Sequence, residues 1–499
     1  MRAIKYLLTF LLILSCLKTT ARTYYISTGG SLKNKGTKTS PFSFDYLYQK
    51  INHAGDTFIV MCGVYKGHHI TNVYGRPGKP VIVKSEEWLE AKLVGQREKV
   101  EGKRRILWIK GDYSHFSGFE IYDTETDRIT SDGSAFYLSS GISLYGKYSK
   151  AHSNVIHDVS EGIESWSPAI GSELSWNYVY NVGWQASNGG HGHLAYIQNR
   201  KDINIRKTVA YNVGFSNAGE GMHIYTEKGN ISNINVLYNF IFRTGTLSKV
   251  GRGNRTYIMG GKQEMLNLTC IGNHSYGSMV QIGYDKWWFT KNLIFDDNYI
   301  TGSIQFKGVE EVKSFKNNTV ITNNDFIRIQ YKYDRAKQSQ DIPIENNTIY
   351  KFKGTSQPKV GLQQADKEGR GKGTVRIDLN KTKWGDKNTA LVQSPPQRYF
   401  LYINQYNPSI ANVYVYNPDS LDRYPIKLDG FAKPGDNILI RDVEKIHNVY
   451  AQTYQHELSL PMDLTEVALP IGDLPKKNIQ HTDKSIGVFV LENLGRAVE

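Results

Sequence analysis

Short runs of β-branched and aromatic residues, separated by glycine, proline and asparagine, make up most of the chain. Residues 57–61 (TFIVM) and 81–84 (VIVK) are early examples. Runs of this length between turn-forming residues predict β-strands. Residues 44–51 (FDYLYQKI) instead have apolar positions at helical spacing and predict one short helix. The pattern as a whole predicts an all-β protein.

An asparagine followed by apolar or β-branched residues recurs through the middle of the chain. It stands at Asn154, Asn177, Asn239, Asn273, Asn298, Asn318 and Asn347. One interval is about twice the others, and Lys207 stands where the missing asparagine would fall. A regular period with several short strands per repeat predicts a β-solenoid. Asparagine tolerates a left-handed corner, and its amide can bond the same residue on the neighbouring coil.

Several motifs resemble a known superfamily. TYYIS, GTKTSPF, INHAGDTFIVMCGVYKG and GRPGKPVIVKS resemble the N-terminal cap and first coils of secreted pectate-lyase-like β-helix proteins, chondroitinase B and alginate lyases among them. SNVIHDVSEGIESW, GHGHLAYIQN and GEGMHIYTEKGN resemble right-handed β-helix repeat proteins. The resemblance covers about residues 23–350 and implies a right-handed parallel β-helix with a polysaccharide as its substrate.

The repeat pattern ends well before the C-terminus. We expect the right-handed parallel β-helix over residues 22–352, followed by a polar, basic loop or linker over 353–396. Alternating strands in 397–499 predict a small antiparallel β-sandwich. This segment resembles the accessory sandwich of many glycan-active enzymes, which implies a stabilising or sugar-docking role.

The N-terminus has the pattern of an export signal. Arg2 and Lys5 precede a short apolar run that ends in small residues. This predicts a signal peptide over residues 1–21 and a secreted or periplasmic protein. Lipid attachment at Cys16, which would give an outer-membrane lipoprotein, is the less favoured alternative.

The charge of the chain bears on its partner. The sequence carries 61 basic and 47 acidic side chains, a formal net charge of +14. A basic surface favours an anionic partner. For an exported protein we expect an acidic polysaccharide or oligosaccharide and no nucleic acid. Three cysteines cannot form a disulfide scaffold, and we expect a monomer.

The middle of the chain contains the densest run of imidazole and polar aromatic side chains. Alternation along the strand at 195–197 places Tyr196 and Gln198 on the outer surface of the coil. In the next coil it places His223 and Tyr225 there. Parallel stacking then sets Tyr196 beside His223, about 4.8 Å apart along the solenoid axis. It likewise sets Gln198 beside Tyr225. A one-residue error in register would turn all of these side chains inward.

These side chains suit the cleavage of a uronic-acid polymer by β-elimination. That reaction needs a group that neutralises the carboxylate, a base for the proton at carbon 5 and an acid for the leaving oxygen. The predicted catalytic residues are His193 and His223 as base and Tyr196 and Tyr225 as acid. The predicted substrate-binding residues are Trp184, His191, Gln198, Lys228, Arg252, Arg255 and Lys262, of which Arg255 and Gln198 would hold the carboxylate. The base could equally be a lysine, as in several lyases of the resembled superfamily, and each residue alone could serve a structural role.

Other activities remain open from the sequence. A glycoside hydrolase needs a pair of carboxylates, and Asp158 with Glu161 is the best of the acidic candidates. A C5-epimerase would share the proton abstraction, and a non-catalytic glycan-binding protein would share the fold. Two metal sites are weaker alternatives. Zinc could bind His191, His193 and His223, and calcium could bind Asp285, Asp296 and Asp297. We predict no metal, with calcium as the one cofactor left open.

Overall fold

The structure is a computed structural model of the 499-residue chain. It describes residues 21–97, 104–131, 137–226, 231–249, 255–284, 290–323, 325–332, 342–352, 356–366, 371–475 and 479–496. The predicted signal peptide lies outside the described residues except for Ala21, and so does Cys16. In the described part of the chain, no helix is long and apolar enough to cross a membrane.

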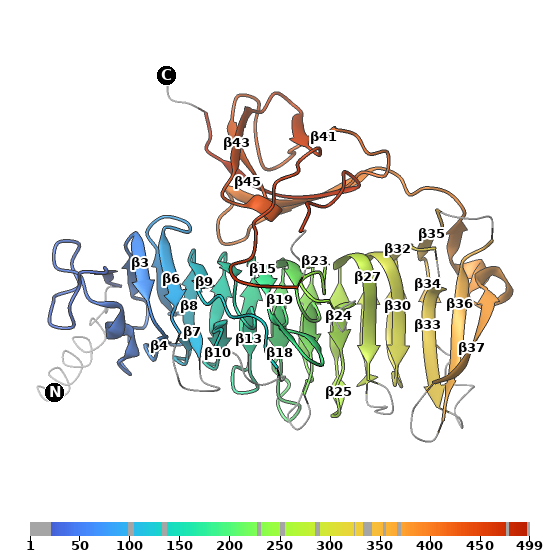
Figure 1. Cartoon of the computed structure of the whole chain (residues 1–499), viewed down its shortest axis with the longest axis horizontal. Coiled ribbons are helices and arrows are strands. Elements are labelled where there is room, and N and C mark those ends of the chain that lie inside the picture. The colour runs from blue at the N-terminus through green and yellow to red at the C-terminus, as the bar shows by residue number, and fades with distance from the viewer. Residues whose placement is uncertain are drawn as a thin grey trace, which may run out of the picture.

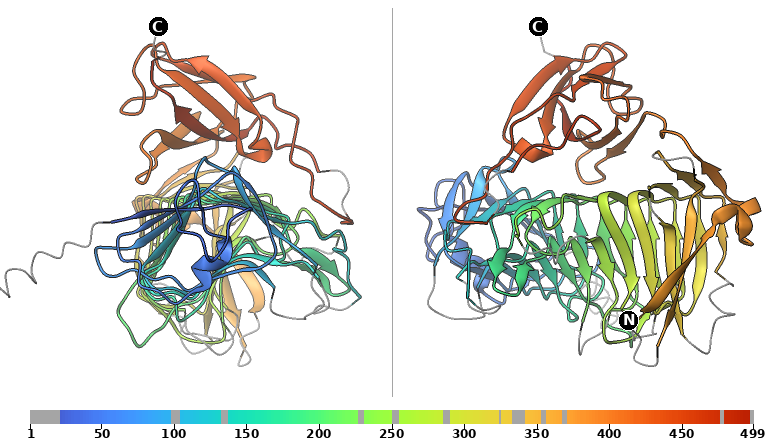
Figure 2. Two further views of the ribbon diagram at one scale, coloured as in Figure 1. Left: turned by 90° about the vertical axis from the view of Figure 1, so that its left-hand side faces the viewer. Right: turned by 45° about the vertical axis from the view of Figure 1, so that its right-hand side comes forward.

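The chain winds into a solenoid of parallel strands with three faces, and a separate antiparallel unit lies on one of them (Figure 1). The predicted fold class, a right-handed parallel β-helix followed by a β-sandwich, is confirmed. Each coil visits the three faces in turn, so residues one coil apart in the sequence become neighbours on adjacent coils of the same face (Figure 2). Aliphatic and aromatic side chains stack inside the solenoid from Ile26 to Trp384 and form its core.

The first face is a twelve-stranded parallel sheet. Its strands are β1 (Thr23–Ile26), β2 (Thr57–Val60), β5 (Val81–Ser85), β8 (Ser114–Ser117), β11 (Lys150–His152), β14 (Glu173–Ser175), β19 (Lys207–Ala210), β22 (Ile234–Leu237), β26 (Leu268–Ile271), β29 (Leu293–Asp296), β31 (Val312–Lys316) and β34 (Ile344–Glu345).

The other two faces belong to one sheet that bends at two long strands, β27 (His274–Gly283) and β30 (Tyr299–Lys307). The N-terminal halves of these strands continue the second face, made of β3 (Gly63–Lys66), β6 (Ala91–Gly95), β9 (Glu120–Asp123), β12 (Val155–His157), β15 (Tyr178–Val182), β20 (Val213–Asn217), β23 (Phe240–Phe242), β32 (Thr319–Ile321), β35 (Thr348–Tyr350) and β38 (Thr389–Leu391). Their C-terminal halves continue the third face, made of β4 (His69–Thr71), β7 (Arg105–Ile109), β10 (Ser140–Leu144), β13 (Ile163–Ser165), β18 (Ala195–Ile197), β21 (Met222–Ile224), β24 (Arg255–Met259), β33 (Asp325–Lys332) and β36 (Lys359–Ala365).

Smaller elements complete the solenoid. β16 (Trp184–Ala186) and β17 (Gly189–His191) form an antiparallel hairpin, and β25 (Met265–Leu266) pairs with β28 (Thr290–Lys291). In the described part of the solenoid, the 3-10 turns are η1 (Phe44–Tyr48), η3 (Leu379–Lys381) and η4 (Gly385–Lys387). The helix predicted over 44–51 is therefore only a 3-10 turn.

The solenoid also extends beyond the boundary predicted at residue 352. The predicted loop 353–396 contains β36, which pairs in parallel with β33, and β38, which pairs in parallel with β35. β37 (Gly371–Asp378) returns antiparallel along β36. An antiparallel hairpin on the last coil has one solvated side, which explains why this stretch is polar without being a loop.

The repeated asparagines form a continuous ladder inside the solenoid. The amide of Asn154 donates to Asn177 at 3.0 Å, and the same bond repeats from coil to coil up to Asn388. Asn212, and not Lys207, occupies the position between Asn177 and Asn239. From Asn154 to Asn347, the left-handed residue of the corner is the one before each asparagine of the ladder, for example Trp176 with φ 57°. The asparagine thus serves the ladder, and its predecessor makes the corner.

The C-terminal unit packs two antiparallel sheets together. The larger has the order β39 (Arg398–Ile403), β40 (Ile410–Tyr416), β45 (Ile486–Asn493), β42 (Asn437–Asp442) and β43 (Val449–Thr453), and the smaller pairs β41 (Arg423–Ile426) with β44 (Leu458–Pro461). A 3-10 turn, η5 (Val443–Lys445), follows β42. Alternation in β40 turns Val413 and Val415 toward the smaller sheet and Tyr414 and Tyr416 toward the solenoid. The sandwich thereby covers the second face of the solenoid.

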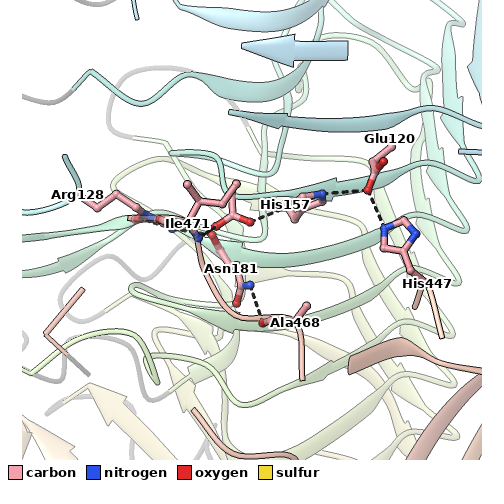
Figure 3. Close-up of polar contacts among 9 residues, drawn as sticks. Glu120, Arg128, His157, Asn181, His447, Ala468 and Ile471 are labelled. Atoms are coloured by element: carbon pink, nitrogen blue, oxygen red, sulfur yellow. Dashed lines mark hydrogen bonds and ion pairs between the residues drawn. The ribbon is translucent and has the colours of Figure 1, made fainter. Parts of the chain in front are cut away.

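Polar contacts fasten the segment before β45 to the same face (Figure 3). The guanidinium of Arg128 is fully buried and donates to Asp158 at 2.8 Å and to the carbonyl of Ile471 at 3.1 Å. Asn181 donates to the carbonyl of Ala468 at 2.9 Å. A buried charge with this many partners is costly to expose, so the segment is held firmly against the solenoid.

Candidate active site on the third face

The third face carries a row of outward side chains on consecutive coils. Tyr196 of β18 pairs in register with His223 of β21, as the alternation predicted. Their neighbours on each strand, such as Ile197 and Met222, are buried in the core, whereas Tyr196 and His223 are partly exposed. Both rings therefore point out of the solenoid on adjacent coils.

A carboxylate and two imidazoles are linked in series at this point. Glu161, in the loop before β13, accepts from the backbone N–H of His193 at 2.8 Å. Its carboxylate also lies 3.0 Å from His193 Nδ1. On the other side of the ring, His193 Nε2 lies 3.0 Å from His223 Nδ1. The order along this chain of hydrogen bonds is Glu161, His193, His223.

The two imidazoles have opposite protonation tendencies. Burial lowers the pKa of His193, but the Glu161 carboxylate outweighs that effect and the pKa is raised from 6.5. Burial, the neighbouring His193 and the positive charge of Arg255 hold the pKa of His223 well below its ordinary value. An imidazole pair with one proton-rich and one proton-poor member is typical of a site that handles protons.

The hydrogen-bond order fixes the tautomers when both rings are neutral. The ionised Glu161 can only accept, so His193 carries its proton on Nδ1 and offers a lone pair at Nε2. His223 then donates from Nδ1, which leaves a lone pair on its Nε2. That atom is buried and has no hydrogen-bond partner among the described residues. His223 Nε2 is thus the proton acceptor at the end of the series.

Aromatic rings surround His223. Tyr225 stacks on it with ring centroids 4.7 Å apart, and Tyr196 meets it edge-on at 5.5 Å. Trp166 lies 5.7 Å from Tyr196, centroid to centroid. The predicted phenols therefore both contact the predicted base.

Arg255, on the next coil, is close to the imidazoles and already paired. It bonds Glu220 at 2.8 Å and donates to Gln281 at 2.7 Å. Its side chain is 28% exposed, and a guanidinium has five N–H donors, so it retains donors for a further anion.

Two carboxyl groups near the imidazoles have pKa values raised by burial. Glu164 pairs in register with Tyr196, and its carboxyl lies 3.4 Å from Arg105 Nε. Glu220 is the partner of Arg255. Sequence reasoning gave neither of them a role in the elimination. It gave Glu161 a different role, because Glu161 comes from a loop whose path strand alternation does not determine.

Four of the other predicted binding residues, Trp184, His191, Gln198 and Lys262, lie in the described part of the chain. Gln198 accepts from Ser167 at 3.1 Å, and Lys262 is half-buried beyond β24. Trp184 is 5% exposed and stacks on His191 within the β16–β17 hairpin, so its ring offers little surface to a sugar. The predicted residues Lys228 and Arg252 lie outside the described part of the chain.

The alternative sites are not assembled as the sequence suggested. Asp158 is engaged by Arg128, His157 and the backbone N–H of Ile471 on the second face, so it is unavailable as the catalytic partner of Glu161. Asp296, at the end of β29, accepts from Ser314 and from the backbone N–H of Lys316 on the neighbouring strand β31. Asp285 lies outside the described residues. Within the described ranges, no three His, Cys, Asp or Glu side chains are grouped to hold a metal ion.

Comparisons with known proteins give information on the fold alone. No family model matches the sequence, and neither does any curated protein. Pectate lyase Pel9A is similar in structure, with 15% identity and a TM-score of 0.40 over 71% of this chain and 79% of that one. A rhamnogalacturonan lyase has 15% identity and a TM-score of 0.37 over 74% and 86%. A mannuronic acid specific polysaccharide family 6 lyase from human gut microbiota has 12% identity and a TM-score of 0.34 over 70% of this chain and 78% of that one. At these values the reaction has to be argued from the chain's own residues.

Proposed function

We propose that the chain is a carbohydrate-active enzyme that cleaves an acidic polysaccharide by β-elimination. The observation that carries the proposal is the Glu161–His193–His223 series on the outer face, which ends in an imidazole nitrogen that has no hydrogen-bond partner among the described residues. The lowered pKa keeps His223 neutral and able to accept a proton, and the second imidazole and the carboxylate stabilise the charge that it then gains.

The proposed elimination removes a proton from carbon 5 and delivers a proton to the leaving oxygen. His223 Nε2 takes the proton from carbon 5 of a uronic acid unit. The released electron pair forms the double bond between carbons 4 and 5, and the bond from carbon 4 to the glycosidic oxygen breaks. Tyr196 or Tyr225 donates a proton to that oxygen. Arg255 stabilises the negative charge that develops on the carboxylate during proton removal.

The proton gained by His223 can be shared along the series. His223 Nδ1–H faces His193 Nε2, and the Glu161 carboxylate stabilises positive charge on His193. The positive charge that His223 gains is thus stabilised through His193 by the Glu161 carboxylate, which favours abstraction of the proton.

A panel of acidic polymers tests the proposal. Wild-type protein is incubated with polygalacturonate, alginate and chondroitin sulfate, and both ultraviolet absorbance and new reducing ends are measured. A lyase produces conjugated unsaturated ends that absorb in the ultraviolet. Reducing ends without that absorbance would instead support hydrolysis.

Hydrolysis is the second candidate, favoured by the raised pKa values of Glu164 and Glu220. A carboxyl group whose pKa is raised is suited to the general acid of a glycosidase. Substitution of Glu164 by Gln would then abolish release of reducing ends, whereas a lyase that relies on His223 would retain most of its turnover.

A further inference from the structure

A cavity of about 480 Å³ lies on the third face of the solenoid, toward its C-terminal end. In Figure 1 this is the region of β30, β33 and β36. The residues that line it include Gln305, Asn323, Asp325 and four basic side chains. No part of the proposed elimination step uses any of them.

The lining of the cavity is strongly basic. Arg328, Lys351, Lys359 and Arg376 contribute four positive charges, and Asp325 is the one acidic residue among the described lining residues. The carboxylate of Asp325 is nearly buried and forms ion pairs with Arg328 at 3.1 Å and with Arg376 at 2.8 Å. Because one carboxylate faces four cations, the cavity keeps a positive balance that an anionic ligand would neutralise.

Two buried polar atoms add a second requirement. Arg328 Nε is a donor and Asn323 Oδ1 an acceptor, and neither has a hydrogen-bond partner among the described residues. An unpaired buried polar group is unfavourable unless a ligand or water satisfies it. A ligand that suits both carries an anionic oxygen for Arg328 and a hydroxyl for Asn323. A uronic acid or sulfated sugar unit has both groups.

The position of the cavity relates it to His223. One register row runs Tyr196, His223, Ile258, Gln281, Gln305, Arg328 on consecutive coils. Arg328 is thus four coils from His223, about 19 Å at the ~4.8 Å spacing of paired strands. That span fits an extended oligosaccharide of several sugar units.

We propose that this cavity is a distal binding site for an acidic sugar unit of the same polymer chain whose cleaved bond lies over His223. The inference rests on the proposed function for the identity of the polymer. It makes the enzyme selective for chains long enough to reach both places, because guanidinium and ammonium groups hold the acidic unit several sugars from the reacting bond.

Equilibrium binding of defined oligosaccharides tests this site. The probes are octasaccharides and disaccharides of galacturonate, mannuronate and chondroitin sulfate, with cello-octaose as the neutral comparison. Titrations use the full chain carrying His223→Gln, so that cleavage does not interfere. Lys359→Gln and Arg376→Gln are added singly, and Lys427→Gln and Arg423→Gln, exposed on the sandwich, are the matched controls.

We expect at least one acidic octasaccharide to bind, and each cavity substitution to weaken it about tenfold, the effect of losing one charged hydrogen bond. The disaccharide and the control variants should show no such loss. Lys359→Gln leaves both bonds of Asp325 intact, so it reports on binding even if Arg376→Gln unfolds.

Three results would overturn the inference: no acidic octasaccharide binds, the cavity variants bind it as tightly as the controls, or the disaccharide loses as much affinity as the octasaccharide. A failure of the proposed function is distinguishable. In that case His223→Gln would retain turnover of the polymer, while the effect of the cavity variants on octasaccharide binding would stand.

Discussion

Replacing Glu161 by Gln tests the role of the imidazole series directly. Gln keeps the shape of the side chain and an oxygen for the backbone N–H of His193, but it removes the negative charge 3.0 Å from Nδ1. A hydrogen bond to a charged group is worth about 1.5–3 kcal/mol and a neutral one about 1 kcal/mol. The difference of roughly 1–2 kcal/mol corresponds to a loss of about 5- to 30-fold in kcat/KM. The two side chains are only 18% and 20% exposed, so solvent screening reduces this little.

The pH dependence separates this role from simple damage to the site. Abstraction needs His193 neutral, so that its Nε2 accepts from His223 and leaves the far nitrogen unprotonated. Glu161 raises the pKa of His193. Activity of the wild type should therefore rise with pH through a midpoint above the ordinary imidazole value of 6.5, and the midpoint should move to lower pH in the Gln variant. The assay is kcat/KM for polymer cleavage as a function of pH. A lower rate with an unmoved midpoint would refute the reasoning.

Three further perturbations follow from the same contacts. His223→Gln should lower turnover about 10²- to 10⁴-fold with little change in thermal unfolding, because the ring lies outside the core; loss of folding by circular dichroism would contradict this. His157 lies between Glu120 and Asp158, which outweigh its burial and raise its pKa from 6.5 to about 9. Its contribution to stability is then complete below pH 6.5 and lost as pH rises through about 9, so urea midpoints should fall over that range in the wild type but less in His157→Gln. Asn239→Ala removes four buried hydrogen bonds and should cost about 3 kcal/mol or more, whereas Asn388→Ala, half-buried at the end of the ladder, should cost clearly less by the same measurement.

Features set by strand alternation could be predicted from the sequence, and features set by loops could not. The outward direction of Tyr196 and His223 followed from the buried aliphatic residues beside them, since side-chain direction in a strand has a period of two. The bond between Glu161 and His193 could not be predicted because Glu161 stands in a loop. Glu161 and His193 are 32 positions apart in the sequence, and the stacking of the coils brings them together.

Lys207 shows a different limit. Its position suggested a substitute in the asparagine ladder, but its side chain is fully buried and its ammonium donates to the carbonyls of Trp166 at 2.9 Å and Gln198 at 2.6 Å. Burial lowers its pKa well below the ordinary value. A buried lysine is rare enough that sequence alone does not predict it, and only the carbonyls around it explain why it is tolerated.

The three faces of a solenoid share one core, so the outward residues alone distinguish them. On the second face these residues are aromatic, as in the stack of Tyr180, Phe215 and Phe242, and the sandwich covers them. On the third face they include the imidazoles of His193 and His223 and the guanidinium of Arg255, which remain partly exposed. Where polar groups of the second face are buried, as at Arg128 and Asn181, carbonyls of the segment before β45 accept their hydrogen bonds, so docking on this face replaces their lost hydration. Between His223 and the cavity the intervening side chains Ile258 and Gln281 are buried, so a polymer chain bound at both places would pass over them without contacting them directly.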